Sequence, residues 1–379
     1  MKIIAISHEY PPIGGGGANA AYNLLNGLAD RGHKVTLVTT AYSGRENIRV
    51  SEGIEIVEVS SKRSKPDSSS FVEMLDYLFK GYKKSKELVK ESILSGKPYD
   101  VAITFFAIPS GPIGYMLKKK YKIPYVIRFG GGDIPGAQKR FDTVYKILRP
   151  AIRAIWRNSD ARITNSEGLK QRASNYYKEC KYEIIPNGVD TVRFTPKEKP
   201  QNSTLNILFV SRLIEGKGLQ YVIPHLNDIV SKANKNIKLT VVGDGPYKEK
   251  LVQLSEQYGV TDIIDFKGKK QGEELASLYR EGDIFILPSE REGMPNVVLE
   301  AMASGLPIVM TPVQGSTELI DGNGFISDID NFPDRIIEQI LDDNLRLSMG
   351  QKSRERAEKL FSWDNTVSGY INVMESIIK

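Results

Sequence analysis

The sequence contains a single cysteine, Cys180, among 379 residues. One thiol excludes an internal disulfide framework and a cysteine-rich metal site, and such sparse usage is typical of a reducing compartment. No run approaches the roughly 20 apolar residues that a membrane-spanning helix requires. Residues 1–7 form a strand-length run with no cleavage signal behind it. We therefore expect a cytoplasmic protein that is neither secreted nor integral to a membrane.

Composition and length indicate a globular chain with two domains. Hydrophobic residues make up 40 % and charged residues 26 % of the sequence, which is ordinary for folded proteins. A chain of 379 residues exceeds the size, about 250 residues, at which single cores usually stop growing.

The charge is divided unevenly along the chain. Residues 1–195 contain 31 Lys and Arg against 19 Asp and Glu, a net of +12, whereas the remainder has a net of −6. This asymmetry favours an anionic partner for the first half, either a membrane surface or a phosphorylated acceptor. A solvated basic face without function explains the same counts.

Apolar, β-rich runs alternate with helix-length amphipathic stretches, which is the pattern of βαβ units around a parallel sheet. The interval 195–203 has two prolines and no periodicity, which predicts a linker. The strand and helix rhythm then restarts, with one helix expected over residues 218–232. We predict an α/β protein with Rossmann-like domains at 1–195 and 204–361, and we expect ligands at the carboxyl ends of the strands.

A glycine-rich loop follows the first strand and precedes a helix expected from Ala18. Its members, Gly14, Gly15, Gly16 and Gly17, would let backbone N–H groups approach an anion, which predicts a phosphate contact. Residues 15–20 also match the dinucleotide fingerprint G-x-G-x-x-A, so a dehydrogenase is a rival interpretation. The second strand ends without the acidic residue that would hold a ribose, which weakens that rival. A merely flexible turn is the third alternative.

Two cations follow the first strand of the second domain. Arg212 offers a planar fork for phosphate oxygens, and Lys217 adds a compact positive charge near the start of the next helix. Together they could neutralise a diphosphate without a metal ion. Taken alone, an Arg and a Lys at this spacing are more often surface charges.

A pair of glutamates flanks the uncharged stretch 293–299. Glu292 lies in a loop after a predicted strand, and Glu300 lies about two turns into the following helix, so both side chains can face one cleft. One carboxylate could contact a sugar while the other accepts hydrogen bonds from ribose hydroxyls. Solvent-facing glutamates are the alternative.

Together these elements resemble glycosyltransferase family 4, the glycosyl transferases group 1, whose members are retaining enzymes of the GT-B fold. The resemblance spans nearly the whole chain and includes the E-x7-E pair, the Arg…Lys-Gly pattern, and the segments 31–36, 185–190, 242–246 and 266–268. It implies two Rossmann-like domains that face each other across a cleft. It also implies that the final helix, 362–379, returns to the first domain.

The resemblance also implies roles for residues in this sequence. Glu292, Arg212 and Lys217 would be catalytic, the two cations holding the donor diphosphate as the nucleotide leaves. The other expected donor-binding residues are Gly15, Gly16, Gly17, Lys267, Gly268, Gly293, Met294, Pro295, Asn296 and Glu300. The resemblance implies no metal, because members of the family typically need no divalent ion. No resident cofactor is expected, because the donor, such as a UDP- or GDP-sugar, is a substrate.

One position departs from the family pattern. Many members carry a histidine after the fifth strand that touches the transferred sugar, and Gly130 stands there in this chain. Asp133 and Arg128 become the candidates for contact with the sugar or acceptor, although a buried structural aspartate is equally compatible with the sequence.

Residues 71–90 combine aromatic and leucine side chains with five lysines. Such a helix can rest on a bilayer while its lysines meet anionic head groups. A stripe of this kind more often packs on the core of its own domain. Related enzymes with lipid-linked acceptors face the membrane with their first domain, which favours membrane contact here. The protein would then lie peripherally on the inner face of the plasma membrane.

We therefore expect a retaining, metal-independent glycosyltransferase that uses a nucleotide sugar and a saccharide or lipid-linked acceptor in cell-surface polysaccharide or glycolipid biosynthesis. Nucleic acid is not an expected partner. The alternative from a different class is a protein that binds nucleotide sugars without transferring them, which the missing histidine motivates.

Overall fold

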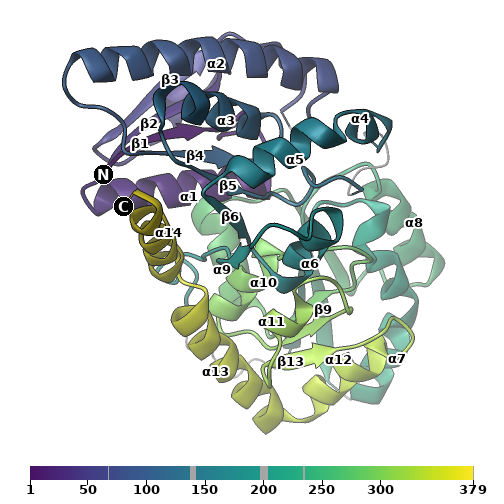
Figure 1. Cartoon of the computed structure of the whole chain (residues 1–379). Helices are drawn as coiled ribbons and strands as arrows, with labels where there is room; N and C mark the ends of the chain where they lie inside the picture. The colour runs from purple at the N-terminus through teal and green to yellow at the C-terminus, as the bar shows by residue number, and fades with distance from the viewer. Residues whose placement is uncertain (67, 137–141, 197–203, 234, 379) are drawn as a thin grey trace. The chain divides into compact units, whose positions relative to one another are not determined.

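A computed structural model describes residues 1–379 except 67, 137–141, 197–203, 234 and 379 (Figure 1). The chain forms two compact units, one of residues Met1–Pro186 with Trp363–Lys379 and one of residues Asn187–Ser362. Most of the predicted linker lies outside the described residues. Within the described residues, no helix is both long enough and apolar enough to cross a membrane.

The first unit is a seven-stranded parallel sheet with strand order β3-β2-β1-β4-β5-β6-β7. Its strands are β1 (Lys2–Ile6), β2 (Lys34–Thr40), β3 (Ile54–Val59), β4 (Val101–Phe105), β5 (Tyr125–Arg128), β6 (Ala161–Thr164) and β7 (Glu183–Ile184). Its helices are α1 (Gly16–Asp30), α2 (Phe71–Leu94), α3 (Ser110–Tyr121), α4 (Asp142–Ile147), α5 (Arg149–Asn158), α6 (Glu167–Tyr176) and α14 (Trp363–Ile378), with a 3₁₀ turn at Arg45–Asn47.

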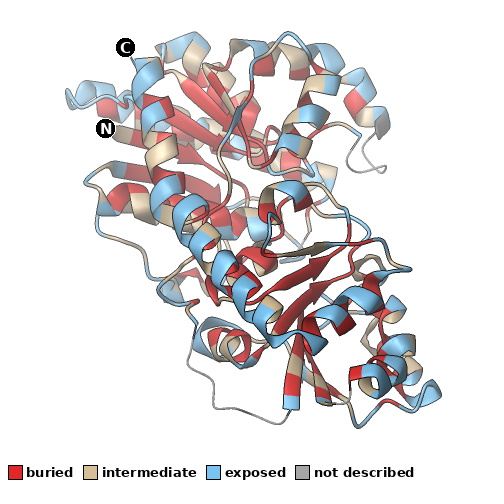
Figure 2. Ribbon diagram, turned by 90° about the horizontal axis from the view of Figure 1, so that it is seen from below, coloured by how far each residue is buried: buried red, intermediate tan, exposed pale blue. Residues whose placement is uncertain are grey.

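Helices cover both faces of this sheet, because neighbouring side chains on a strand point to opposite faces. Ile3 and Ala5 pack in a cluster with α1 and α14, whereas Ile4 and Ile6 pack in a second cluster with α2, α3 and α5. The inner strands β1, β4 and β5 are therefore almost wholly buried, whereas the edge strands β3 and β7 are partly exposed. Figure 2 shows the sheet beneath helices whose outer faces are exposed.

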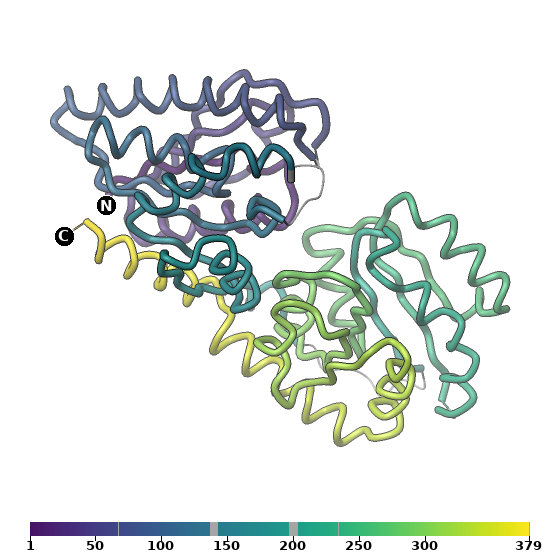
Figure 3. The backbone as a smooth tube through the Cα atoms, turned by 45° about the vertical axis from the view of Figure 1, so that its right-hand side comes forward, coloured from purple at the N-terminus to yellow at the C-terminus, as the bar shows by residue number. Residues whose placement is uncertain are grey.

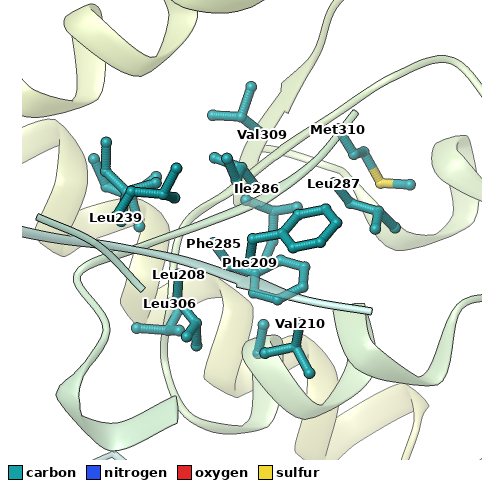
Figure 4. Packing of buried hydrophobic residues seen from close by; sticks show 14 of the residues in the cluster. Leu208, Phe209, Val210, Leu239, Phe285, Ile286, Leu287, Leu306, Val309 and Met310 are labelled. Atoms are coloured by element: carbon teal, nitrogen blue, oxygen red, sulfur yellow. The ribbon is translucent and has the colours of Figure 1, made fainter. Parts of the chain in front are cut away.

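The second unit is a six-stranded parallel sheet with strand order β10-β9-β8-β11-β12-β13. Its strands are β8 (Thr204–Val210), β9 (Asn236–Val242), β10 (Ile264–Gly268), β11 (Ile284–Leu287), β12 (Ile308–Met310) and β13 (Gly324–Ile326). Its helices are α7 (Leu226–Ala233), α8 (Lys248–Gln257), α9 (Gly272–Glu281), α10 (Asn296–Ala303), α11 (Ser316–Leu319), α12 (Phe332–Leu341) and α13 (Asp343–Leu360). Figure 4 shows side chains of β8, β9, β11 and β12 in its continuous core. The expected α/β class and two Rossmann-like domains are confirmed.

The boundary between the units differs from the one we expected at residue 195. The segment after Pro186 joins the second unit, because the Val189 N–H donates to the Phe361 carbonyl at 2.7 Å and Arg354 donates to the carbonyls of Thr191 and Phe194. The final helix belongs to the first unit. It packs against α1 and β6, and Figure 3 shows it in yellow beside the unit that holds the N-terminus.

The helix expected over residues 218–232 is the clearest local error. The chain there forms 3₁₀ turns at Glu215–Lys217, Leu219–Tyr221 and Ile223–His225, and only then α7. Gly218 has a φ of +76°, which a right-handed helix does not contain, and Pro224 lacks the N–H that a helix interior uses.

Candidate active site

Each sheet has one point at which the strand order reverses. It lies between β1 and β4 in the first unit and between β8 and β11 in the second. In open α/β sheets, ligands bind outside the carboxyl ends of the strands at such a switch point. The glycine-rich loop follows β1, Arg212 and Lys217 follow β8, and Glu292 follows β11. The sequence candidates therefore lie at the switch points of their own units.

In the second unit, the loops after β8 and β11 contact each other through their backbones. The Glu290 N–H donates to the Gly216 carbonyl at 3.0 Å. Gly218 has a left-handed φ of +76°, and a Cβ at this position would overlap the Pro288 carbonyl oxygen. Glycine is required here for both reasons, and it lets the two loops close on each other.

Lys217 and Glu292 form an ion pair across these two loops. The Lys217 Nζ donates to Glu292 Oε1, and the side chains are only 21 % and 12 % exposed. A cation and a carboxylate thus stand together at the switch point, where each is shielded from solvent. Arg212 belongs to the same loop as Lys217, and its side chain is exposed.

The segment from Gly293 to Pro295 leads from Glu292 into α10, which begins at Asn296. Asn187 Nδ2 donates to Asn296 Oδ1 at 3.1 Å, which fixes the first side chain of the helix. Gly293 is exposed, and Met294 and Pro295 are buried. The N–H groups in the first turn of a helix lack intrahelical partners, so this segment presents donors and positive dipole at the switch point.

Glu300 lies further along α10 and already has a protein partner. The Tyr279 hydroxyl donates to Glu300 Oε2 at 2.8 Å and to the Val297 carbonyl at 3.2 Å. Burial raises the pKa of Glu300 to about 7, and the hydrogen bond from Tyr279 only partly opposes this effect. The carboxyl group therefore keeps its proton to a higher pH than an exposed glutamate does.

Lys267 and Gly268 end β10, two strands away from β8 in the sheet. Lys267 is exposed and pairs with Asp265 at 2.7 Å, as does Lys238. Gly268 has a φ of +68° where the pairing register shifts, and its carbonyl accepts from the Gly243 N–H at 2.9 Å. These two residues thus lie at the carboxyl end of the edge strand β10, whereas the Lys217–Glu292 pair follows the inner strands β8 and β11.

In the first unit, α1 begins at Gly16 rather than at Ala18. Gly15 is exposed, and a Cβ there would meet no described atom within 4 Å. Gly14 and Gly17 are instead required by packing within the unit. A Cβ at Gly14 would lie 2.7 Å from the Ala18 Cβ, and one at Gly17 would lie 2.6 Å from the Phe106 ring. Gly15 and Gly16 are therefore the part of this loop that an anion can approach.

Two arginines with buried side chains support the loop after β1, and no motif in the sequence pointed to them. Arg45 donates to the carbonyls of Tyr10 and Pro11, both at 3.1 Å, while its side chain is 4 % exposed. Arg63, 3 % exposed, pairs with Glu9 at 3.1 Å. Both arginines follow strands or turns outside any recognisable motif, so only their positions in space show their role.

Asp133 and Arg128 are buried, which favours the alternative of a buried structural aspartate, and their contact with the sugar or acceptor stays a prediction. The carboxylate of Asp133 accepts from the backbone N–H groups of Ala107, at 2.5 Å, and Gly130, at 2.9 Å. Arg128 contacts the hydroxyl of Tyr370 on α14 and moderates the rise in its pKa. Asp133 joins the loops after β4 and β5, and Arg128 connects the sheet to α14.

These observations define the class of protein. Two successive Rossmann-like domains have a glycine-rich loop at one switch point and a cation–carboxylate pair at the other, and this is the GT-B architecture of glycosyltransferases. Within the described residues, no group of three or more His, Cys, Asp or Glu side chains could hold a metal ion.

Comparison with known proteins gives the family. Residues 14–193 match glycosyltransferase family 4, and residues 192–356 match glycosyl transferases group 1. The chain belongs to this family of glycosyltransferases. The assignment replaces the dehydrogenase interpretation of the glycine-rich loop.

Individual relatives agree over the whole length. An uncharacterized glycosyltransferase of Methanocaldococcus jannaschii is 29 % identical and aligns over 98 % of this chain and 97 % of its own. Sucrose-phosphate synthase from Thermosynechococcus elongatus has a similar structure, with a TM-score of 0.80 at 20 % identity over 100 % of this chain and 99 % of its own. Anabaena HepE in complex with UDP-glucose gives a TM-score of 0.74 at 18 % identity, over 99 % of this chain and 100 % of its own.

Proposed function

We propose that the protein transfers a sugar from a nucleoside-diphosphate sugar to a saccharide or lipid-linked acceptor, with retention of anomeric configuration and without a metal ion. The observation that carries this proposal is the Lys217–Glu292 pair at the switch point of the second unit. The similarity to a structure that contains UDP-glucose supports the choice of donor class.

The Lys217–Glu292 pair suits a donor because it supplies both charges that the reaction uses. When a diphosphate binds, its oxygens compete with Glu292 for the Lys217 ammonium, and Arg212 adds a planar fork. Glu292 is then released to accept hydrogen bonds from sugar hydroxyls. As the nucleotide leaves, negative charge grows on the diphosphate, and the two cations and the first turn of α10 stabilise it.

Other residues bind the remaining parts of the donor in this proposal. Glu300 accepts hydrogen bonds from the ribose, for which its carboxylate form is the better acceptor. Lys267 and Gly268 line the space for the base at the end of β10. Within the first unit, Gly15, Gly16 and the first turn of α1 offer backbone donors at their own switch point.

Helix α2 supports a lipid-linked acceptor and peripheral contact with an anionic membrane. Phe71, Leu78 and Tyr82 pack against the core, so most of the apolar stripe is internal. Val72 and Phe79, seven residues apart on one face, are instead 63 % and 71 % exposed. The exposed Lys80 and Lys83 lie next to Phe79 and one turn beyond it, and a helix with exposed apolar side chains beside lysines can insert them between anionic head groups. We propose glycolipid or cell-surface polysaccharide synthesis on this basis.

A panel of UDP- and GDP-sugars, measured by thermal stabilisation and by sugar transfer, tests the function. A bound donor raises the melting temperature because it binds only the folded chain. We expect one donor to stabilise the protein and to be consumed, and Glu292→Gln to retain folding while transfer falls by about 100-fold or more. Binding without transfer by the wild type would identify a nucleotide-sugar-binding protein instead. No response to any donor would contradict both interpretations.

A further inference from the structure

The side chain of Phe106 lies at the switch point of the first unit, and no motif pointed to it. Phe106 directly follows β4, the strand beside the reversal in strand order. Its N–H donates to the Arg128 carbonyl of β5 at 2.9 Å, which fixes its place between β1 and β5. Its ring is half-buried, so part of it remains accessible at the edge of the sheet where ligands of this fold bind.

The ring of Phe106 fits between two glycines on different loops. A Cβ at Gly17 would lie 2.6 Å from its Cζ atom, and a Cβ at Gly130 would lie 2.5 Å from its Cδ1 and Cε1 atoms. Contacts this short do not occur, so neither loop tolerates a side chain while the ring is in place. The ring therefore occupies the room in which a histidine at position 130 would begin.

The backbone of Phe106 is strained. Its φ is +71°, a left-handed conformation that is a clear outlier for a bulky residue. Asp133 holds the adjacent peptide by accepting the Ala107 N–H at 2.5 Å. Strain of this kind persists only where the surroundings impose it, and it concentrates at active sites and ligand clamps.

The ring of Phe106 packs against His8. The two ring centroids are 4.9 Å apart in an edge-on arrangement, and the His8 side chain is 9 % exposed. Burial, and then the charge of Arg63, lowers the pKa of His8 to about 3. The imidazole is therefore neutral at physiological pH, and the Phe106 ring packs against an uncharged aromatic group.

We propose that the accessible face of Phe106 is the surface on which the pyranose ring of a substrate stacks, and that this residue determines which sugars the protein accepts. The inference rests on the proposed function and deepens it. An aromatic face attracts the C–H groups of a sugar, whereas a histidine would donate a hydrogen bond to a hydroxyl. The two side chains therefore favour the binding of different sugars. The sugar belongs either to the donor or to the acceptor, which share this chemistry.

Four variants test the role of the ring. Phe106→Leu removes the ring and keeps an apolar side chain, and Phe106→Tyr keeps the ring. Gly130→Ala displaces the ring without altering it. Phe106→Gly removes the ring and relieves the backbone strain, so it remains folded if strain makes the other variants unstable. Calorimetry measures the Kd of UDP, GDP, UDP-glucose, UDP-N-acetylglucosamine and GDP-mannose, and transfer is measured to water, octyl glucoside and octyl mannoside.

We expect UDP and GDP to bind all variants as they bind the wild type. If the ring holds the donor sugar, Phe106→Leu and Gly130→Ala weaken the nucleotide sugar about tenfold, or about 1.4 kcal/mol. If it holds the acceptor sugar, donor affinity is unchanged and the KM of the glycoside rises about tenfold. Phe106→Tyr stays near the wild type in both cases.

Two results would overturn the inference while the proposed function stands. One is wild-type behaviour of Phe106→Leu and Phe106→Gly in both arms, and the other is an equal loss of affinity for UDP and for UDP-sugars, which a purely structural role would produce. A wild-type chain that binds none of the five probes would instead refute the proposed function, and the inference with it.

Discussion

Replacing Glu300 by glutamine should make the protein more stable at neutral pH and should flatten the dependence of its stability on pH. Burial raises the folded-state pKa of Glu300 to about 7, well above the value near 4.3 of an unfolded glutamate. Between about pH 4.5 and 7 this site is ionised in the unfolded chain and protonated in the folded chain, so folding takes up a proton. Stability falls as the pH rises through that window, and the full penalty applies above it.

The size of the effect follows from the shift. A rise in the pKa of Glu300 from 4.5 to about 7, at about 1.36 kcal/mol for each unit of pKa, corresponds to about 3 kcal/mol of stability. Glutamine has nearly the same shape, and its carbonyl still accepts the hydrogen bond from Tyr279, but it carries no charge. Glu300→Gln should therefore exceed the wild type in stability by more at pH 8 than at pH 5, with the difference approaching this magnitude.

Differential scanning calorimetry between pH 5 and pH 8 measures the difference, with Glu256→Gln as the matched control. Glu256 is an exposed glutamate on α8 in the same unit, so its neutralisation should change little. Nucleotide binding gives a second readout. If the ribose binds the carboxylate form of Glu300, the carboxyl group should lose its proton when the nucleotide binds near pH 7. An identical pH profile for Glu300→Gln and the wild type would refute the reasoning.

Three further substitutions test local claims. Gly218→Ala should lower the free energy of unfolding by more than 3 kcal/mol, because the new Cβ overlaps the Pro288 carbonyl oxygen and the backbone conformation is also strained. The control Gly259→Ala has a φ of +63° but open space around the Cβ, so it should lose only about 1–2 kcal/mol. Urea unfolding compares the two variants. Asp133→Asn should lower stability by about 1–3 kcal/mol in the same assay, since an amide can satisfy only one of the two N–H donors, and an unchanged midpoint would argue against the bracing role. Phe79→Ser should weaken sedimentation with anionic vesicles several-fold, whereas the exposed Leu347→Ser control on α13 should not; equal binding would exclude α2 as the contact.

The sequence predicted the fold class and the positions of most strands because buried parallel strands are apolar and glycine-rich loops punctuate them. It also placed Arg212, Lys217 and Glu292 in the correct strand-end loops. What it could not predict was contact between segments far apart in the chain. The Lys217–Glu292 pair joins residues separated by 75 positions, and no local pattern reports such a pair.

The remaining differences have the same origin. The sequence left open whether Asp133 contacts a ligand or is a buried structural residue, and only the folded chain shows that backbone donors from two loops hold its oxygens. Gly130 looked like the loss of a functional side chain, and only the position of the Phe106 ring explains the glycine. The 3₁₀ turns after Gly218 were missed because amphipathic spacing continued through them, although Gly218 and Pro224 were the available signals.

The proposed function requires a nucleoside-diphosphate donor, for which the loop after β1 offers backbone N–H groups in the first unit and Arg212 and Lys217 offer cations in the second. Gly15→Asp tests it most directly, because the site has room for the side chain and aspartate is a favoured residue before the first turn of a helix. Gly15→Asn is the matched neutral control, and calorimetry gives the affinity for UDP.

If the diphosphate lies against this loop, the added carboxylate repels it. Gly15→Asp should then bind UDP at least tenfold more weakly than Gly15→Asn, as Arg212→Ala should relative to the wild type, while both glycine variants melt at or above the wild-type temperature. Equal UDP affinity for Gly15→Asp and Gly15→Asn would contradict the account.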